Sequence, residues 1–290
     1  MTAATRKRPA LQASVLYDAP GPKARARYRI YSVVSLLALA ALIVLVIWQM
    51  QRTGQFEYEL WEYFVTPQYL EVILVDGVLN TLKAAGVAIL AALALGLVFG
   101  VGKLSDHAFI RWPSWLWVEF FRAVPLLLLI IYIYFSFGTK GTLGIGALWS
   151  LVAGLALYNG AVLAEIVRAG ILALPKGQSE AAYAIGMTKG QVTRIVLLPQ
   201  AVKIMLPAMI SQFVVCLKDT SLGYAIGAIG ITVVFKAIWL DGRNHVQAII
   251  VMAAIYIVLN LIVTWIAHWA QRRYVGEGKV GAQAAADEAV

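Results

Sequence analysis

Residues 177–201 read GQSEAAYAIGMTKGQVTRIVLLPQA and form a polar insert between two long apolar segments. Charged side chains are costly inside the hydrocarbon of a bilayer, so a segment of this composition is expected outside it. The insert therefore predicts a contact with a partner beyond the membrane, and the rest of the chain indicates which partner. Its polar and charged side chains include Gln178, Ser179, Glu180, Thr188, Lys189, Gln191 and Arg194.

The composition of the chain indicates a membrane protein. Its 290 residues are 61% hydrophobic and only 13% charged, with a mean hydropathy of +0.78. Several apolar runs reach the about 20 residues with which a helix crosses a bilayer, and none alternates as a transmembrane strand does. Because backbone groups in lipid must be satisfied within the chain, we expect an all-α polytopic membrane protein with about six transmembrane helices.

The positive charge of the chain, +9 in total, points to topology rather than to nucleic acid. Basic side chains gather in the cytoplasmic segments of membrane proteins, so both termini and the polar insert are predicted to be cytoplasmic. The N-terminal cluster consists of Arg6, Lys7, Arg8, Lys23, Arg25, Arg27 and Arg29.

The apolar runs divide the chain into five parts. We expect a basic cytoplasmic tail (1–30), an N-terminal span (31–50), an extracytoplasmic segment (51–75), a transmembrane domain (76–270) and a cytoplasmic tail (271–290). Within the domain the expected spans are 77–102, 113–137, 147–166, 201–217 and 248–270, and the mixed, glycine-rich segment 218–243 is too polar for a plain span.

Local signals predict two helices in the polar insert. Pro175 ends the preceding helix, residues 178–185 are good helix formers, and Gly186 is typical of a helix C-terminus. A capping box at 188–191 starts a second helix that is expected to end before Pro199. Small side chains are predicted to be exposed beside Ile185 and Met187, which suits docking into a groove on a protein; the alternative is an amphipathic helix lying on lipid. The small residues are Ala181, Ala182, Ala184 and Gly186.

The sequence EAAYAIGMTKGQ, followed by VLLPQA, resembles the EAA loop of permease subunits in binding-protein-dependent ABC importers. Other matches, over residues 75–268, are similar to the polar amino-acid branch: NTL at 80–82, FFRAVP at 120–125, EIVR at 165–168 and KDTSL at 218–222. RAVPLLLL at 122–129 looks like actinobacterial-type glutamate permeases, although family members often have a glutamine after the proline, which puts any substrate contact of that glutamine in doubt.

The resemblance implies a five-helix type I importer core, with one additional N-terminal span, in a bacterial inner membrane. It implies that the helix of the insert is a coupling helix that enters a cleft on a separate ATPase. The residues assigned to that interface are Gln178, Glu180, Ala181, Ala182, Ile185, Gly186 and Met187.

The chain has no GxxxxGK[ST] phosphate-binding loop, so any ATP and Mg²⁺ are expected on partner ATPase subunits and no cofactor is expected here. The resemblance further implies a second permease subunit, identical or related, an extracytoplasmic substrate-binding protein and an amino-acid substrate, for which glutamate is the candidate. No clustered catalytic set or metal-binding pattern is present in the sequence, so we expect neither an enzyme nor a metal site. An ion-gradient-driven secondary amino-acid transporter is the alternative.

Ionisable residues inside predicted spans are candidates for function. Arg122 follows Glu119 by three positions, so a local ion pair is favoured over an arginine that attracts a substrate carboxylate. Glu165 and Arg168 repeat this spacing and are expected to brace the insert. Asn159 is expected to contact a neighbouring helix. The polar run at 218–221 is either a solvated helix end or a lining of the pathway. The candidate pathway residues are Arg122, Asn159, Lys218, Asp219, Thr220 and Ser221.

Overall fold

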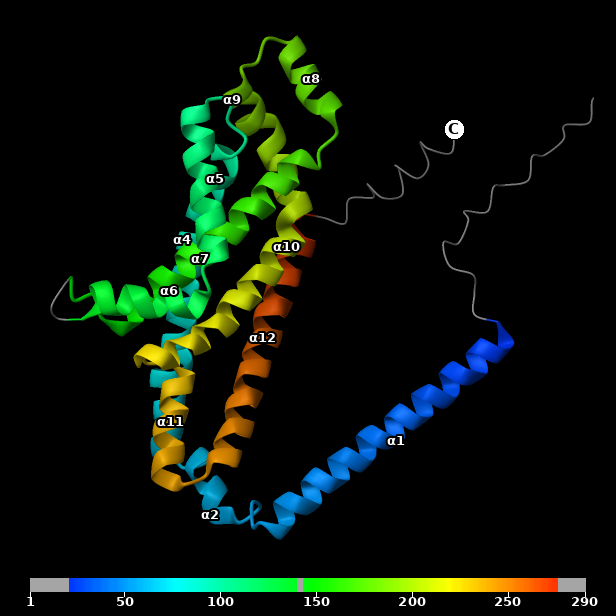
Figure 1. Cartoon of the computed structure of the whole chain (residues 1–290), viewed down its shortest axis with the longest axis vertical. Helices are drawn as coiled ribbons and strands as arrows, with labels where there is room; N and C mark the ends of the chain where they lie inside the picture. The colour runs from blue at the N-terminus through cyan, green and yellow to red at the C-terminus, as the bar shows by residue number, and fades with distance from the viewer. Residues whose placement is uncertain (1–20, 140–142, 276–290) are drawn as a thin grey trace, which may run out of the picture. The chain divides into compact units, whose positions relative to one another are not determined.

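The computed structural model describes residues 21–139 and 143–275, without the side chains of 22 and 272–275. Two compact units divide the chain, Met1–Glu57 and Tyr58–Val290. All regular structure in the described ranges is helical, so the all-α prediction is confirmed (Figure 1). Most of the two predicted tails, including Arg6, Lys7 and Arg8, lies outside the described residues.

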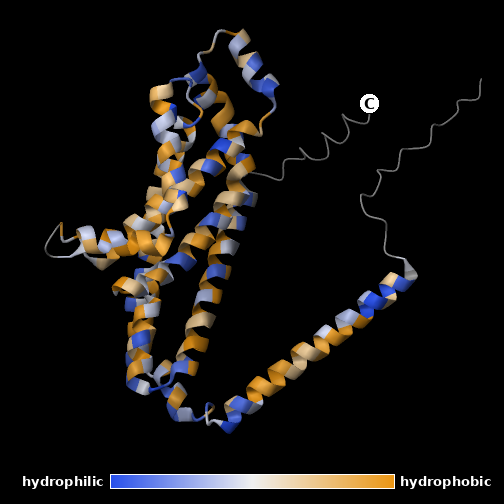
Figure 2. Ribbon diagram, in the orientation of Figure 1, coloured by the Kyte–Doolittle hydropathy of each residue, from blue (hydrophilic) through white to orange (hydrophobic). Residues whose placement is uncertain are grey.

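The first unit contains one long helix, α1 (Pro22–Arg52), which begins with a proline in its first turn. Its start carries arginines and its middle is apolar, as the colouring in Figure 2 shows. It is long and apolar enough to cross a membrane. The predicted N-terminal span is therefore confirmed as a helix, and the helix begins nine residues before Tyr31 because Pro22 is well suited to a first helical turn.

The second unit contains all other helices. In chain order they are α2 (Tyr58–Trp61), η1 (Glu62–Phe64), α3 (Pro67–Val72), η2 (Ile73–Leu79), α4 (Asn80–Gly102), α5 (Ala108–Ala123), α6 (Leu126–Ile133), η3 (Tyr134–Gly138), α7 (Gly146–Leu172), α8 (Lys176–Ala184), α9 (Lys189–Gln191), η4 (Val192–Leu197), α10 (Leu198–Asp219), η5 (Thr220–Ile226), α11 (Ile231–Gly242) and α12 (His245–Val275). In the described part of the whole chain, five helical runs could span a membrane, or up to six with one bent pair.

Helices α4 and α7 form the main helix–helix interface of the second unit. A Cβ added to Gly96 would lie 2.7 Å from Cβ of Leu163, and one added to Gly100 would lie 2.7 Å from the carbonyl oxygen of Ala164. Small residues at these positions let the two backbones approach closely, which is how transmembrane helices gain packing contacts without a hydrophobic driving force. The glycine- and alanine-rich sequence of α4 thus decides where α7 lies.

The third predicted span is not straight. Helix α5 ends at Ala123, and the α6–η3 helix that follows is bent from it by 101°. Val124 has an extended backbone (φ −75°, ψ 128°) because a residue before proline avoids the helical region, and Pro125 has no N–H to continue the ladder. The predicted third span, 113–137, is thus a pair of helices broken at Val124 and Pro125, which counts as one span only if the bent pair crosses the membrane as a unit.

Two other helical runs are longer than predicted. The run Pro67–Gly102 starts ten residues before Gly77, and the run Lys189–Ile226 passes through Pro199, where a break was predicted. A π-helical segment, η4, directly precedes α10, and Pro199 lies in the first turn of α10. The wider turn accommodates a proline that would otherwise break an α-helix by its ring and its missing N–H.

Helix α11 was not predicted, because its segment was considered too rich in glycine. It packs against η2 and α12. The Ile231 N–H donates to Thr81 Oγ1 at 3.0 Å, and the rings of Phe64 and Phe235 stack with centroids 5.8 Å apart. This cluster ties residues 58–75, predicted to be a separate extracytoplasmic segment, into the second unit.

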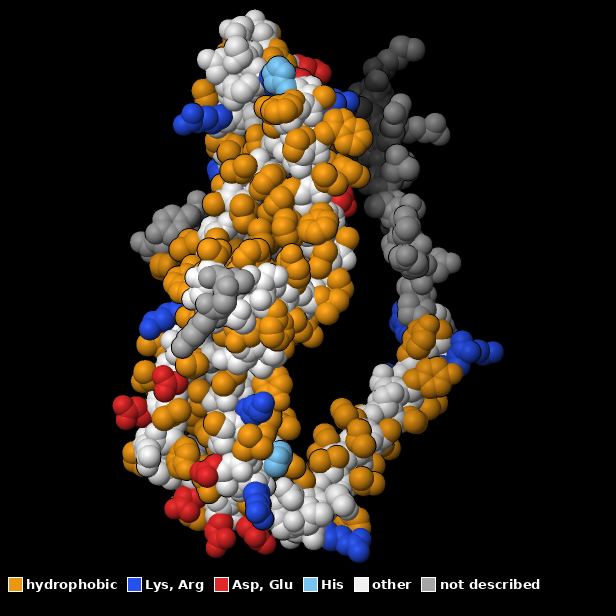
Figure 3. Space-filling view, turned by 60° about the vertical axis from the view of Figure 1, so that its left-hand side comes forward, with side chains coloured by type: hydrophobic (Ala, Val, Ile, Leu, Met, Phe, Trp, Pro, Cys, Tyr) orange, Lys and Arg blue, Asp and Glu red, His pale blue; other side chains and the backbone are white. Residues whose placement is uncertain are grey.

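The surface of the second unit is that of a membrane protein. Figure 3 shows apolar side chains over the middle of the bundle and acidic side chains gathered at the end away from α8. Large apolar side chains such as Leu90 and Trp265 are both 70% exposed. A soluble protein rarely exposes apolar area of this extent, so this surface faces lipid.

Candidate coupling surface and transport pathway

Helix α8 lies at one end of the bundle, beside α9 (Figure 1). It starts after Pro175 and ends in a left-handed glycine, Gly186, with φ +85°. The Gly186 N–H donates to the Tyr183 carbonyl at 2.9 Å, and the Met187 N–H donates to the Ala182 carbonyl at 3.2 Å. These two bonds form a Schellman motif, which satisfies the last carbonyls of the helix. The predicted helix and its glycine stop are confirmed.

The outward face of α8 differs in part from the prediction. Ala182 was predicted to be exposed but is buried at 5% exposure, and Met187, assigned to the same interface, is half-buried. The cause is the helical period: α8 packs against η4, so the face that carries Ala182 turns inward. Among the exposed residues, Tyr183 was not singled out from the sequence. The exposed residues from 176 to 186 are Lys176, Gly177, Gln178, Glu180, Ala181, Tyr183, Ala184, Ile185 and Gly186.

Side-chain contacts fix this end of the bundle. Gln200 Nε2 donates to Gln178 Oε1 at 3.3 Å, which joins α10 to α8. The predicted capping box is present, since the Thr188 N–H donates to Gln191 Oε1 at 2.8 Å where α9 begins. Lys189 forms an ion pair with Asp106 in the α4–α5 loop. The hydrogen bond from Lys189 lowers the pKa of the Asp106 carboxyl below its ordinary value.

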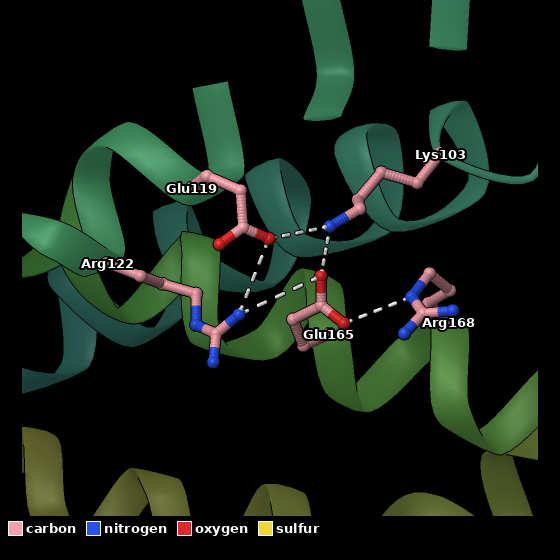
Figure 4. A network of polar contacts seen from close by, with 5 residues as sticks. All are labelled: Lys103, Glu119, Arg122, Glu165 and Arg168. Carbon is pink, nitrogen blue, oxygen red and sulfur yellow. Dashed lines mark hydrogen bonds and ion pairs between the residues drawn. The ribbon is translucent and has the colours of Figure 1, made fainter. Parts of the chain in front are cut away.

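Two predicted ion pairs are parts of one larger network (Figure 4). Arg122 Nη1 lies 3.7 Å from Glu119 Oε1, and Arg168 Nε lies 3.0 Å from Glu165 Oε2. Lys103 Nζ forms an ion pair with each carboxylate: it lies 3.2 Å from Glu119 Oε1, and it also contacts Glu165 Oε1. The network joins the end of α4 to α5 and α7 near the point where α7 leads into α8.

Lys103 is the residue that sequence reasoning missed at this network. Its side chain is only 7% exposed, against 42% for Glu119 and 21% for Glu165. A signal was present, because a single lysine directly after a long apolar span has to find a carboxylate once packing removes it from water.

A second candidate site is a cavity of about 560 Å³ between α10 and α12. Lys218 and Ser221, both predicted pathway residues, line it from one side. Among the described residues Lys218 forms no ion pair. Asn260 Nδ2 donates to the Tyr256 carbonyl at 2.6 Å, whereas its Oδ1 is buried without a hydrogen-bond partner in the described part of the chain. The full lining is Val214, Lys218, Ser221, Ala253, Tyr256, Ile257, Asn260, Leu261 and Thr264.

The other predicted pathway residues do not meet in this cavity. Asn159 is buried and accepts a hydrogen bond from Gln212 Nε2 at 2.6 Å, so it joins α7 to α10 as a helix contact. Thr220 is buried, and its hydroxyl donates to the Leu217 carbonyl. Asp219 does not line the cavity, and Arg122 belongs to the charged network. Polar residues four apart on one apolar helix, 256, 260 and 264, were the signal that the sequence offered for the opposite wall.

A bent bundle of spanning helices with a short exposed helix at one end is the architecture of an importer permease, and the comparisons agree. Residues 88–276 match the family described as binding-protein-dependent transport system inner membrane component. The chain belongs to this family. It is a multi-pass inner-membrane permease subunit, and ATP hydrolysis takes place on a separate subunit.

Relatives and solved structures are consistent with that assignment. The chain is 41% identical over 222 residues to a glutamate transport system permease protein of Corynebacterium glutamicum, covering 76% of this chain and 81% of the relative. It is 32% identical to an arginine transport system permease protein of Bacillus subtilis, over 69% and 91% of the two chains. An amino acid ABC transporter solved with histidines has a TM-score of 0.64 at 31% identity, over 73% of this chain and 98% of that one.

Proposed function

We propose that this permease subunit carries an acidic amino acid, glutamate first, through a pathway that includes the α10–α12 cavity. The proposal is supported by the 41% identity to a glutamate permease over 222 residues. The family assignment favours ATP-driven import over the ion-gradient alternative, because members work with a binding protein.

The observation that carries the substrate class is the chemistry of the cavity wall. Lys218 offers an ammonium without a carboxylate partner in the described part of the chain, on the same wall as the hydroxyl of Ser221. Opposite them, Asn260 Oδ1 is a buried acceptor that lacks a donor among the described residues. An acidic amino acid can pair with both groups, because its carboxylates accept hydrogen bonds from the Lys218 ammonium and its own ammonium donates one to Asn260 Oδ1. Buried polar groups are costly until they are paired in this way.

The α8 end of the bundle is proposed to face the cytoplasm and to dock the ATPase. Cations on the segments at this end include Lys103, Arg111, Lys176, Lys189 and Arg194, while the segments at the opposite end carry Glu59, Glu62, Glu71 and Asp241 beside Arg243. Such a distribution of lysine and arginine favours the cytoplasmic side. Exposed Ala181, Tyr183 and Ile185 present a small apolar face suited to a groove.

The remaining partners follow from that arrangement. Two permease subunits, identical or related, enclose the pathway, and an extracytoplasmic binding protein delivers the amino acid at the acidic end. ATP and Mg²⁺ are bound by the ATPase subunits. When these subunits close, α8 moves with them and shifts α7, to which α4 and α5 are joined through Lys103.

The substrate assignment is tested by uptake in proteoliposomes that contain the complete transporter. Lys218→Met is expected to lower glutamate uptake about tenfold or more, since a hydrogen bond to a charged group contributes about 1.5–3 kcal/mol. The matched control is Lys203→Met, an exposed lysine on the same helix that does not line the cavity. Equal uptake by the two variants, or a wild type that carries arginine and rejects glutamate, contradicts the proposal.

The coupling assignment is tested by the ATPase activity of the same preparation. Glu180→Trp is expected to abolish stimulation of the ATPase by the permease while the variant stays in the membrane, because the bulky ring blocks a close contact. Glu59→Trp, the same change at an exposed site on the opposite end, is expected to leave stimulation unchanged. Normal stimulation with Glu180→Trp would show that α8 does not dock the ATPase.

A further inference from the structure

A second cavity, of about 550 Å³, lies at the α8 end of the bundle. Its wall is built from the end of α4, from α5 and from α7, and it includes the whole charged network of Figure 4. Every lining residue is either charged or a tryptophan, in contrast to the mostly apolar cavity between α10 and α12. The lining residues are Lys103, Arg111, Trp112, Trp115, Glu119, Arg122, Glu165 and Arg168.

The charges of this wall do not balance. Arg111 donates to the backbone carbonyls of Ser105 and Asp106 and lies near the Asp106 carboxylate. The three remaining cations, Lys103, Arg122 and Arg168, face two carboxylates, which leaves a net charge of +1 in one concave site. A bracing network needs only enough cations to neutralise its carboxylates, and Lys103 with either arginine would do so. The surplus therefore indicates a site for an anion, because like charges held together without a counter-charge repel one another.

The surplus also appears in the hydrogen bonds. The nearest carboxylate oxygens to Arg122 Nη1 are 3.7 and 3.9 Å away, beyond hydrogen-bond range. Arg168 donates to Glu165 through Nε, at 3.0 Å. In Figure 4 the two guanidinium groups lie on either side of Glu165. The side chains of Arg122 and Arg168 are 42% and 37% exposed, so their terminal nitrogens are accessible to a ligand that accepts several hydrogen bonds.

The rim of the cavity selects the kind of anion. Trp112 is 63% exposed and Trp115 is 45% exposed, and the adjacent Ile110 is 46% exposed. Tryptophan is enriched where the hydrocarbon of a bilayer meets its headgroups. A cationic pocket with such a rim suits a ligand that has a phosphate at one end and an apolar body along the surface of the bundle.

We propose that this cavity binds the phosphate of an anionic phospholipid, with Arg122 and Arg168 as its main ligands. A lipid bound there contacts α5 and α7 together, directly beside the segment that leads into α8. The assignment of the lipid to the cytoplasmic leaflet rests on the orientation given under the proposed function, whereas the binding itself does not. Since the cavity that contains Lys218 is a different one, lipid binding and substrate transport are separable.

The test uses the complete transporter in nanodiscs of phosphatidylcholine with or without phosphatidylglycerol. We expect native mass spectrometry to detect bound phosphatidylglycerol and thermal unfolding to show a higher Tm in its presence. The double variant Arg122→Gln/Arg168→Gln is expected to bind this lipid about 25-fold more weakly, at roughly fivefold per cation near a membrane surface. The matched control is Arg194→Gln, an exposed arginine at the same end that does not line the cavity, and it is expected to bind as the wild type does.

Several outcomes overturn the proposal. Equal lipid binding by the double variant and the control shows that the cavity is not the site. If the double variant does not fold, the single variant Arg168→Gln is compared with the control in the same way. Stabilisation of the wild type in phosphatidylcholine by inorganic phosphate, to the same extent as by phosphatidylglycerol, assigns the site to a free phosphate. Displacement of the lipid by glutamate assigns it to substrate. Glutamate uptake, measured separately, reports on the proposed function and not on the lipid.

Discussion

At the residue scale, Lys103 is the charged group that links both carboxylates of the network in Figure 4. Its ammonium is nearly buried and forms ion pairs with the carboxylates of Glu119 on α5 and Glu165 on α7. A charge taken from water is stable only when its partners are held in place, and removal of one partner leaves the others uncompensated. Lys103 therefore adds an electrostatic link between α4, α5 and α7 to the packing contacts of these helices.

Lys103→Met is expected to destabilise the protein by about 1.5–3 kcal/mol, because two charge-assisted hydrogen bonds are lost and two carboxylates face each other. The measurement is the Tm of the purified protein in detergent. Lys83→Met, an exposed lysine on α4 without an ion pair among the described residues, is the matched control and is expected to leave Tm nearly unchanged. Similar Tm values for both variants would mean that the network contributes nothing to stability.

Asp106 adds a pH dependence to the junction between the α4–α5 loop and α9. Because the hydrogen bond from Lys189 lowers its pKa in the folded state, the contribution of Asp106 to stability is present above the ordinary carboxyl pKa. It is lost as the pH falls through the lowered folded value. The Tm difference between wild type and Asp106→Asn is therefore expected to be constant from about pH 5 to 7 and to shrink below about pH 4. A difference that grows on acidification contradicts this sign.

At the element scale, the α4–α7 pair holds the bundle together through backbone proximity. Gly100→Val is expected to cost about 1–3 kcal/mol, because a Cβ added there would lie 2.7 Å from the Ala164 carbonyl oxygen and 2.9 Å from Cβ of Val167. Gly86→Val is the matched control on the same helix, since a Cβ there meets nothing within 4 Å. Both are compared by thermal unfolding in detergent. Equal losses would indicate a helix-propensity effect instead of a packing effect.

The bend between α5 and α6 depends on Pro125. Pro125→Ala restores an N–H and lets Val124 enter the helical region, so α5 and α6 are expected to become more nearly collinear. Spin labels at exposed positions Phe109 and Phe135 report the change as a longer mean distance by pulsed electron paramagnetic resonance. An unchanged distance distribution would show that packing of α6 against α7, and not the proline, holds the bend.

At the scale of the whole molecule, the chain consists of two compact units, and the family match begins at residue 88, inside the second. The match to the solved amino acid transporter includes 98% of that chain but only 73% of this one. The second unit is therefore expected to fold without residues 1–57. Deletion of these residues should leave the detergent Tm within about 2 °C, a shift that corresponds to less than about 1 kcal/mol for a domain of this size. A large drop in Tm would show that α1 is part of the folded core.

The amino-acid sequence was sufficient to predict the fold class, the approximate positions of the spans, and the helix, glycine and capping box of residues 176–191. These follow from short-range physics, because apolar length, glycine at a left-handed position and a Thr–Gln box act within a few residues. It also placed Glu119 beside Arg122 and Glu165 beside Arg168, since a spacing of three is local on a helix.

The tertiary structure alone decided which of these groups meet. The burial of Ala182, the role of Lys103 and the wall that Asn260 forms opposite Lys218 depend on how helices distant in the chain pack. The same holds for two prolines. The helix breaks at Pro125, after Ala123, whereas it continues through Pro199 because a π-helical segment precedes that proline. The physical reason is that the sequence pattern of a single helix indicates only which side chains share a face. Which faces are in contact depends on the close approach of two backbones at glycines such as Gly96 and Gly100.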